Sequence, residues 1–234
     1  MTTDLIRETL RNLANPNIAG HSQRFFKTGP GEYGEGDRFL GIRVPVLRKQ
    51  VGEFQQTTLQ EIQEILSSPF HEERLFALLL LVHKFSKGKD DERSRIYQMY
   101  LDNTDYINNW DLVDCSAHKI VGAYLGDKDK RRLYHLARSD SLWERRIAIM
   151  ASFDFIRNHE FDDALKLSML LLGDREDLIH KAVGWMLREI GKRDIIIEKA
   201  FLESNYKNMP RTMLRYAIEK FPEPERLDYL QGRV

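Results

Sequence analysis

The chain lacks the features that mark several classes of protein. It holds one cysteine, Cys115, among 234 residues. An internal disulfide is therefore excluded, and a reducing cytoplasmic setting is expected. The first residues include acidic side chains and no apolar core, so we expect no secretory signal. The apolar run 76–82 is far too short to cross a bilayer.

Familiar catalytic motifs are also missing. The seven histidines show no ligand spacing with Cys, Asp or Glu, and no His-Glu-x-x-His string occurs, so no metal site is expected. Neither a Gly-x-Ser-x-Gly elbow nor a kinase-type loop is present. The glycines between Gly29 and Gly36 lack the strand-turn-helix context of a phosphate-binding fingerprint. This stretch is interpreted as a loop, and zinc or activated-serine hydrolysis is disfavoured.

Neither sign of charge dominates. Lys and Arg together number 36, as do Asp and Glu, which gives a formal net charge of zero. Bulk charge therefore indicates no nucleic-acid partner. If such a partner exists, the basic residues must be gathered on one face.

What the chain does have is helical periodicity. From about Leu59 onward, apolar residues recur at spacings of three and four, and proline and glycine fall between the runs. Strand-like alternation and Asn-Gly hairpin turns are absent. The sequence predicts an all-α fold.

The helices repeat along the sequence. A basic residue opens an apolar run at Arg74, Arg146, Lys181 and Arg215, with separations of 72, 35 and 34. The first gap equals two periods of 36, which places a missing copy near Trp110. Such a period with two helices per unit is typical of HEAT-like αα solenoids, which curve around a concave groove. Tetratricopeptide repeats have a similar period, but their signature residues are not visible.

We therefore expect residues 1–234 to form one HEAT-like repeat domain. Residues 1–58 would supply N-terminal helices and the glycine-rich loop, with a helix near 3–14 and Pro45 in the first turn of another. Tandem repeats would occupy 59–221, and 222–234 would cap the last repeat.

All three tryptophans lie one helical turn from a charged residue. Trp110 precedes Asp114 by four, Trp143 precedes Arg146 by three, and Lys181 precedes Trp185 by four. These spacings put each ring and its charge on the same face of a helix. One acid and two bases beside apolar rings suit a surface that grips a polyanion and acts on one sugar.

Simpler interpretations stay open for each of these residues. Asp114 could cap a turn, the tryptophans could fill the core between helices, and Arg146 and Lys181 could be solvated or paired with acids such as Glu144. The basic cluster Lys128–Arg132 could touch DNA or simply open a solvated helix.

Four segments carry a resemblance to a known family. They are Trp110-Asp-Leu-Val-Asp114, Leu142-Trp-Glu-Arg-Arg-Ile-Ala-Ile149, Ile179-His-Lys-Ala-Val-Gly-Trp-Met-Leu-Arg-Glu189 and Phe39-Leu-Gly-Ile-Arg-Val-Pro45. Together they resemble the AlkD-type DNA alkylation-repair glycosylases, HEAT-like solenoids that hold damaged duplex DNA in a concave groove. The resemblance extends from about residue 24 to residue 218.

The resemblance implies a DNA repair enzyme that hydrolyses the N-glycosidic bond of cationic N3- and N7-alkylated purines. It implies a monofunctional glycosylase that acts in base excision without metal or organic cofactor. The expected partner is duplex DNA containing alkylated purines, with no membrane, and the chain is expected to be a monomer. Asp114 corresponds to the family's catalytic aspartate, stabilising the oxocarbenium-like sugar and positioning water.

The same resemblance assigns the binding residues. Trp110 and Trp185 correspond to the family's groove tryptophans and Arg146 to its phosphate-binding arginine. Phe25 takes the place of an N-terminal tyrosine, which removes a hydroxyl but preserves stacking. Lys181 is expected to hold a flanking phosphate, and Trp143 to contribute a further ring at the DNA-binding surface.

Two other functions are compatible with the sequence. One is a non-catalytic HEAT-like solenoid that binds bent or branched DNA. The other is a protein-interaction scaffold, which the balanced net charge favours.

Overall fold

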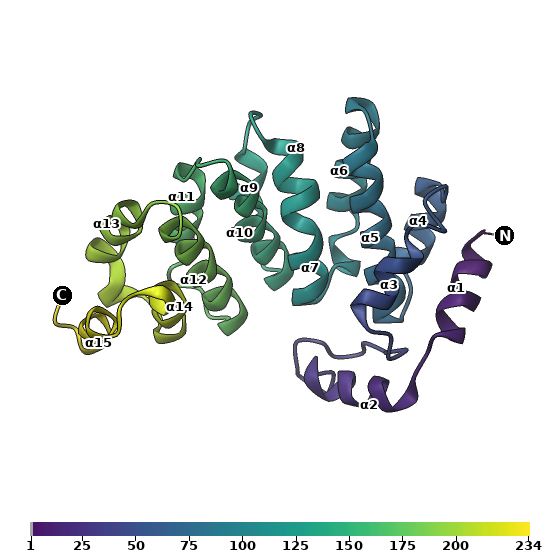
Figure 1. The fold of residues 1–234 in the computed structure, drawn as a ribbon, viewed down its shortest axis with the longest axis horizontal. Helices are drawn as coiled ribbons and strands as arrows, with labels where there is room; N and C mark the ends of the chain where they lie inside the picture. Colours follow the sequence, from purple (N-terminus) through teal and green to yellow (C-terminus); the bar gives the residue numbers. More distant parts are fainter. Residues whose placement is uncertain (1) are drawn as a thin grey trace. The chain divides into compact units, whose positions relative to one another are not determined.

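The computed structural model describes residues 2–234 (Figure 1). Within this range the chain forms helices joined by turns, with an isolated bridge between Arg38 and Phe70 and no strand. The all-α prediction is confirmed.

The described chain divides into two compact units. The first ends at Ser116, and the second comprises Ala117–Val234. Each is built from helices that pack on one another, and each is described separately below. The single-domain interpretation, with its divisions near residues 58 and 221, stays a prediction.

The first unit is organised around α5, His71–Lys87. Its segment Leu75–Leu81 is buried throughout, because helices pack on more than one side of it. Helices α3, α4 and α6 all pack against α5, and α1 packs on α4. Their bounds are α1 Thr2–Asn12, α3 Val44–Gln50, α4 Leu59–Leu66 and α6 Asp90–Asp102. Helix α4 begins at Leu59, where helical periodicity was predicted to start.

A second N-terminal helix, α2, spans Pro16–Phe25 and was not predicted. Asn15 caps it by accepting from the backbone N–H groups of Asn17 and Ile18, and Pro16 occupies its first position. Asparagine followed by proline is a helix-start signal, so the sequence did contain the information. Pro45 lies in the first turn of α3, as predicted.

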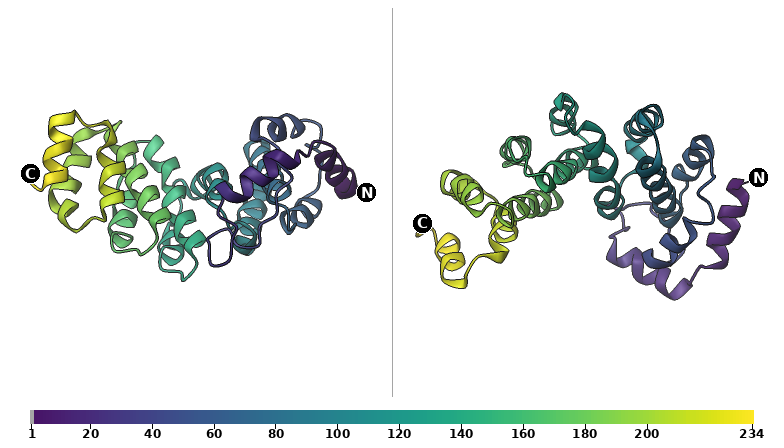
Figure 2. Two further views of the ribbon diagram at one scale, coloured as in Figure 1. Left: turned by 90° about the horizontal axis from the view of Figure 1, so that it is seen from below. Right: turned by 45° about the horizontal axis from the view of Figure 1, so that its top comes forward.

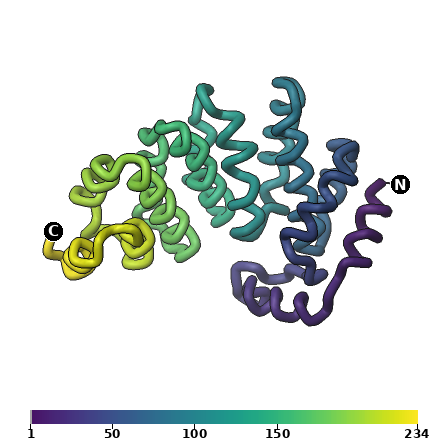
Figure 3. The backbone as a smooth tube through the Cα atoms, viewed as in Figure 1, coloured from purple at the N-terminus to yellow at the C-terminus, as the bar shows by residue number. Residues whose placement is uncertain are grey.

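Residues 27–43 connect α2 to α3 without forming a helix, as Figure 3 shows in its trace. The buried carboxylate of Glu72 anchors this connection by accepting from the backbone N–H groups of Leu40, Gly41 and Ile42. Gly41 has φ +80°, and a Cβ there would lie 2.1 Å from the Asn15 carbonyl oxygen. The loop interpretation of Gly29–Gly36 is confirmed. The part of the connection that follows this loop is held to α5 through Glu72.

The second unit is a row of helix pairs (Figure 2). Helix α12 packs between α10 and α14, while α9 and α11 pack on α10, and α11 and α13 pack on α12. The bounds are α8 Ala123–Leu125, α9 Arg131–Leu136, α10 Leu142–Arg157, α11 Asp162–Leu170, α12 Asp177–Gly191, α13 Ile195–Asn205, α14 Arg211–Ala217 and α15 Glu223–Gln231. A π-helical turn, His118–Gly122, precedes α8.

The repeat positions all fall on helices. Arg74 lies in α5, Arg146 in α10, Lys181 in α12 and Arg215 in α14. The missing copy lies in α7, which spans Trp110–Ala117. Among residues 2–234, no helix is both long and apolar enough to cross a membrane.

Candidate nucleic-acid interface

Helix α7 presents Trp110 at its first position, against two phenylalanines from the end of α2. The Trp110 ring stacks on Phe26 with centroids 5.2 Å apart and 20° between the planes. Phe25 meets Trp110 edge-on at 6.0 Å, and 57% of Phe25 is exposed. The structure thus brings together two residues of the predicted site that are far apart in the sequence. Phe25 offers an accessible aromatic edge to a ligand.

Asp114 lies one turn after Trp110 on the same helix and is half-buried. The predicted pairing of this acid with Trp110 on one helix is confirmed. The buried Tyr100 hydroxyl of α6 lies 2.9 Å from Ser116 Oγ of α7, and this hydrogen bond connects the two helices. Burial raises the pKa of Tyr100, and the nearby charges of Cys115 and Asp114 act in the same direction. Tyr100 therefore stays a neutral phenol that holds α7 in place.

Below the aromatic stack, the first unit contains a buried cluster of charges that sequence reasoning missed. His71 Nδ1 lies 3.1 Å from Asp37 Oδ2, and His71 Nε2 lies 2.8 Å from Asp111 Oδ2. Arg74 Nη2 donates to Asp37 Oδ1 at 2.6 Å. Burial acts against ionisation of Asp37, but hydrogen bonds and charge from His71 and Arg74 lower its pKa overall. The two aspartates lie 34 to 40 positions from the basic residues that they face, so no local pattern connects the acids to the bases.

In the second unit, Trp185 lies on α12 and is half-buried. Its indole N–H donates to Glu189 Oε1 at 3.2 Å, and its ring lies 6.3 Å from Phe153 of α10. Glu189 also pairs with Lys192 and Arg193, which lower the pKa of its carboxyl against the effect of burial. Glu189 and Phe153 were not predicted as site residues, although Glu189 follows Trp185 by one helical turn.

The two predicted phosphate-binding residues differ in accessibility. Arg146 of α10 is 4% exposed, and its guanidinium donates to the Leu178 carbonyl. Lys181 of α12 is half-exposed and pairs with Asp177 at 2.7 Å. Each shares a helix with its tryptophan, as the spacing predicted, and Trp143 is half-buried at the start of α10. Their contact with phosphate stays a prediction.

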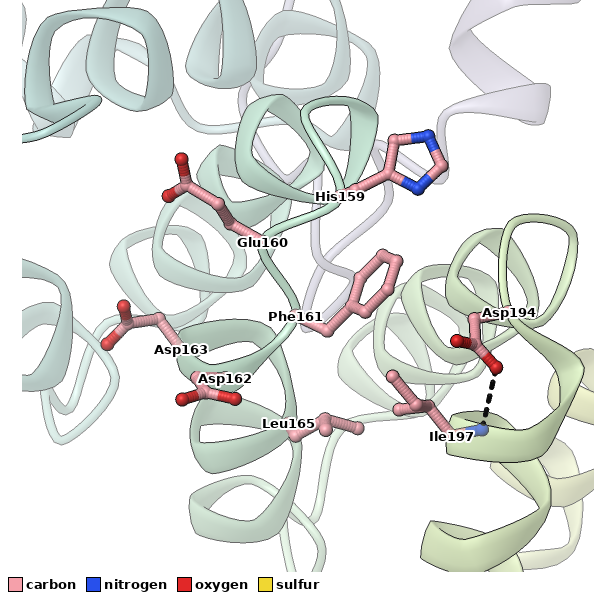
Figure 4. Close-up of a pocket in the computed structure, with 8 residues that line it drawn as sticks. All are labelled: His159, Glu160, Phe161, Asp162, Asp163, Leu165, Asp194 and Ile197. Atoms are coloured by element: carbon pink, nitrogen blue, oxygen red, sulfur yellow. Dashed lines mark hydrogen bonds between the residues drawn. The ribbon is translucent and has the colours of Figure 1, made fainter.

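The second unit also holds an open pocket of about 860 Å³ away from these residues (Figure 4). Its lining includes the carboxylates of Glu160, Asp162, Asp163 and Asp194. Asp194 caps α13, and Asp162 and Asp163 lie in the first turn of α11, so helix ends account for these acids. This negative lining disfavours contact with a polyanion. Among residues 2–234, no group of His, Cys, Asp and Glu side chains is arranged to hold a metal ion.

Solved structures with the same fold come from streptococci and enterococci. A predicted DNA alkylation repair enzyme from Enterococcus faecalis matches with TM-score 0.69 and 18% identity, covering 90% of this chain and 97% of its own. AlkD2 from Streptococcus mutans matches with TM-score 0.55 and 16% identity, over 88% and 98% of the two chains. The protein smu.31 from Streptococcus mutans UA159 matches with TM-score 0.54 and 17% identity, over 95% and 100%.

Among curated protein sequences, none matches the chain. A family model does match it, under the description "DNA alkylation repair enzyme", over residues 6–221. This range includes α7 and its aromatic neighbours in the first unit, and α10 and α12 in the second. With its helical repeats, the chain belongs to the DNA alkylation repair enzyme family.

Proposed function

We propose that this protein is a monofunctional DNA glycosylase that releases cationic N3- and N7-alkylated purines from duplex DNA. The observation that carries the proposal is the pairing of Asp114 with Trp110 on α7, where Phe25 adds an exposed ring. Family membership supports a role in alkylation repair. The proposal adds to this the bond that is broken and the residue that acts on it.

The chemistry requires little beyond one carboxylate. Alkylation at N3 or N7 puts positive charge on the purine, so the glycosidic bond is already weakened. As this bond breaks, positive charge develops on the sugar, and Asp114 stabilises that charge while orienting the attacking water. The face of Trp110, on the same helix as Asp114, attracts the same developing cation. Neutral bases lack this activation and are poor substrates.

The basic residues of the second unit are proposed to hold the backbone. Lys181 exchanges its ion pair with Asp177 for a phosphate at small cost, because exposed ion pairs contribute at most about 1 kcal/mol. Arg146 is fixed in direction by the Leu178 carbonyl, so less side-chain entropy is lost when it meets a phosphate. Phosphate contacts of this kind set position without reading sequence. Trp143, at the start of α10, supplies a further ring.

The test is release of free base from a duplex carrying one N7-methylguanine, measured under single-turnover conditions. Asp114→Asn removes the charge and keeps the shape, so we expect base release to fall by on the order of a hundredfold or more. DNA affinity should change by only about threefold, because Asp114 contributes no phosphate contact. Asp105→Asn, an exposed acid in the turn before α7, is the matched control and should behave as wild type.

Each alternative function has its own outcome in this assay. Tight DNA binding with no base release by the wild type would overturn the glycosylase and indicate a non-catalytic DNA-binding protein. Neither release nor binding would leave a protein-interaction scaffold. Full activity of Asp114→Asn would remove Asp114 from the chemistry.

A further inference from the structure

The first unit contains a histidine whose surroundings leave it little freedom. His71, the first residue of α5, is 1% exposed. Its ring stacks against Phe39 at 4.6 Å and lies 4.9 Å from Phe26. Each ring nitrogen faces a carboxylate oxygen, one from Asp37 and one from Asp111.

This geometry favours the imidazolium form of His71. A neutral imidazole has one N–H donor and one acceptor, so one of its nitrogens would face a carboxylate oxygen with no proton between them. With both nitrogens protonated, His71 donates to both carboxylates. Arg74 supplies the second positive charge, so two cations balance two anions in the cluster. The faces of Phe26 and Phe39 add cation–π attraction.

The cluster is attached to the first turn of α7 at two points. Asp111 accepts from His71 with Oδ2 and from the Leu112 backbone N–H with Oδ1, at 2.9 Å. Asn109 donates to Asp37 at 3.4 Å and accepts from the Trp110 backbone N–H at 2.9 Å. A shift of the His71 ring would therefore move the start of α7. It would also move Phe26, whose ring contacts His71 at a tilt of 37° and stacks on Trp110.

We propose that His71 is a positioning residue. As an imidazolium it fixes the first turn of α7, and thereby the positions of Trp110 and Asp114. His71 acts only through Asp37, Asp111 and Phe26. The inference rests on the proposed glycosylase function for its effect on rate. Its effect on Trp110 is independent of that function.

The variants for the test are His71→Gln and Asp111→Asn. The glutamine is neutral, and both of its N–H donors are on one nitrogen, so it cannot reproduce the two donors that His71 presents from separate ring nitrogens. The asparagine keeps an oxygen for the Leu112 N–H and removes the charge that faces His71. Asp111 is half-buried, so its variant remains informative if His71→Gln folds poorly. His83→Gln, a half-buried histidine on the same helix, and the exposed Asp105→Asn are the matched controls.

For single-turnover base release we expect both variants to slow by on the order of ten- to a hundredfold, because small misplacements of reacting groups are costly. DNA affinity should stay within about threefold of wild type. The double variant should lose no more than the slower single variant, since both remove one contact. Wild-type rates in either single variant, or multiplied losses in the double variant, would overturn the proposal.

A second measurement follows Trp110 directly, in a chain with Trp143→Phe and Trp185→Phe. His71→Gln should shift Trp110 emission to longer wavelength and raise its quenching by acrylamide, and His83→Gln should change neither. Burial disfavours the charged form of His71, but Asp111 and Asp37 outweigh it and raise the pKa of His71 to about 9. Raising the pH through this value should move Trp110 emission in the His71 protein and not in His71→Gln. Emission that is insensitive to His71→Gln overturns the proposal.

The two proposals fail in different ways. If wild type and His83→Gln release no base, the glycosylase is wrong, and Trp110 emission alone decides whether His71 positions α7. If wild type releases base and neither rate nor emission responds to His71→Gln, the positioning role is wrong and the glycosylase stands.

Discussion

The indole N–H of Trp185 donates to Glu189, one helical turn further along α12, at 3.2 Å. Glu189 is 7% exposed and is held in turn by Lys192 at 2.6 Å and Arg193 at 3.1 Å. The guanidinium of Arg193 also lies over the Phe153 ring at 5.8 Å. The orientation of Trp185 is therefore set by a buried carboxylate whose own direction is fixed by two cations.

Glu189→Ala should release Trp185 from this orientation and leave two cations without their partner. A hydrogen bond to a charged acceptor contributes about 1.5–3 kcal/mol, so we expect base release to slow by on the order of tenfold. The measurement is the single-turnover rate, with Trp185 emission followed in a chain carrying Trp110→Phe and Trp143→Phe.

The control for this prediction is Glu203→Ala, which removes an equal charge from an exposed position on α13. It should leave both the rate and Trp185 emission unchanged. An unaltered rate and emission in Glu189→Ala would show that Phe153 and the neighbouring helices hold Trp185 without the carboxylate.

Gly184→Ala should destabilise the second unit. A Cβ at Gly184 would lie 2.4 Å from the Met213 carbonyl oxygen and 2.6 Å from Tyr216 Cβ, so α12 and α14 would have to move apart. Overpacking of this kind costs about 1–3 kcal/mol, which corresponds to a fall in Tm of roughly 2–12 °C. Thermal unfolding followed by circular dichroism measures it.

Gly173→Ala is the matched control in the same unit, because nothing lies within 4 Å of a Cβ built there. Its Tm should stay within a degree or two of wild type or rise slightly, since alanine restricts the unfolded chain. Equal Tm values for Gly184→Ala and wild type would mean that the α12–α14 contact adjusts freely.

The sequence predicted what depends on local periodicity. Trp110 and Asp114, or Lys181 and Trp185, are one turn apart, and the 3.6-residue period alone puts such pairs on one face. The start of α4 at Leu59 and the place of Pro45 follow from similarly local rules. The contact between Phe25 and Trp110 did not follow from spacing, because it depends on how the loop after α2 returns to α5 and α7.

Buried charges were the harder part of the molecule to predict. Nothing in the local sequence distinguishes His71, Asp37 and Asp111 from other polar residues. They form a cluster only because the fold brings three distant segments into contact. The burial of Glu198 was equally hard to predict, because its neighbours Ile195–Ile197 do not indicate that the acid is buried. In the structure its carboxylate lies directly over Gly191, where a Cβ would overlap it.

Glu198 carries the last prediction, a pH-dependent contribution to stability. It is 2% exposed, and its Oε1 accepts no hydrogen bond from residues 2–234. Burial raises the pKa of Glu198 to about 8, with the charge of Glu225 adding to the effect and Arg188 and Lys199 opposing it. The unfolded chain has the ordinary value of 4.5.

Because the folded pKa is raised, the folded state keeps a proton that the unfolded state has already released. The contribution of Glu198 to the free energy of unfolding is fully present below about pH 4.5 and is lost as pH rises through about 8. Stability therefore falls across that window. Glu198→Gln mimics the protonated side chain, so wild type should lose on the order of 1–3 kcal/mol relative to this variant between about pH 5 and about pH 8. Urea unfolding at the two pH values measures the difference, with the exposed Glu203→Gln as control. Parallel pH dependence in wild type and Glu198→Gln would mean that Glu198 is already ionised in the folded protein, with Arg188 and Lys199 stabilising its charge.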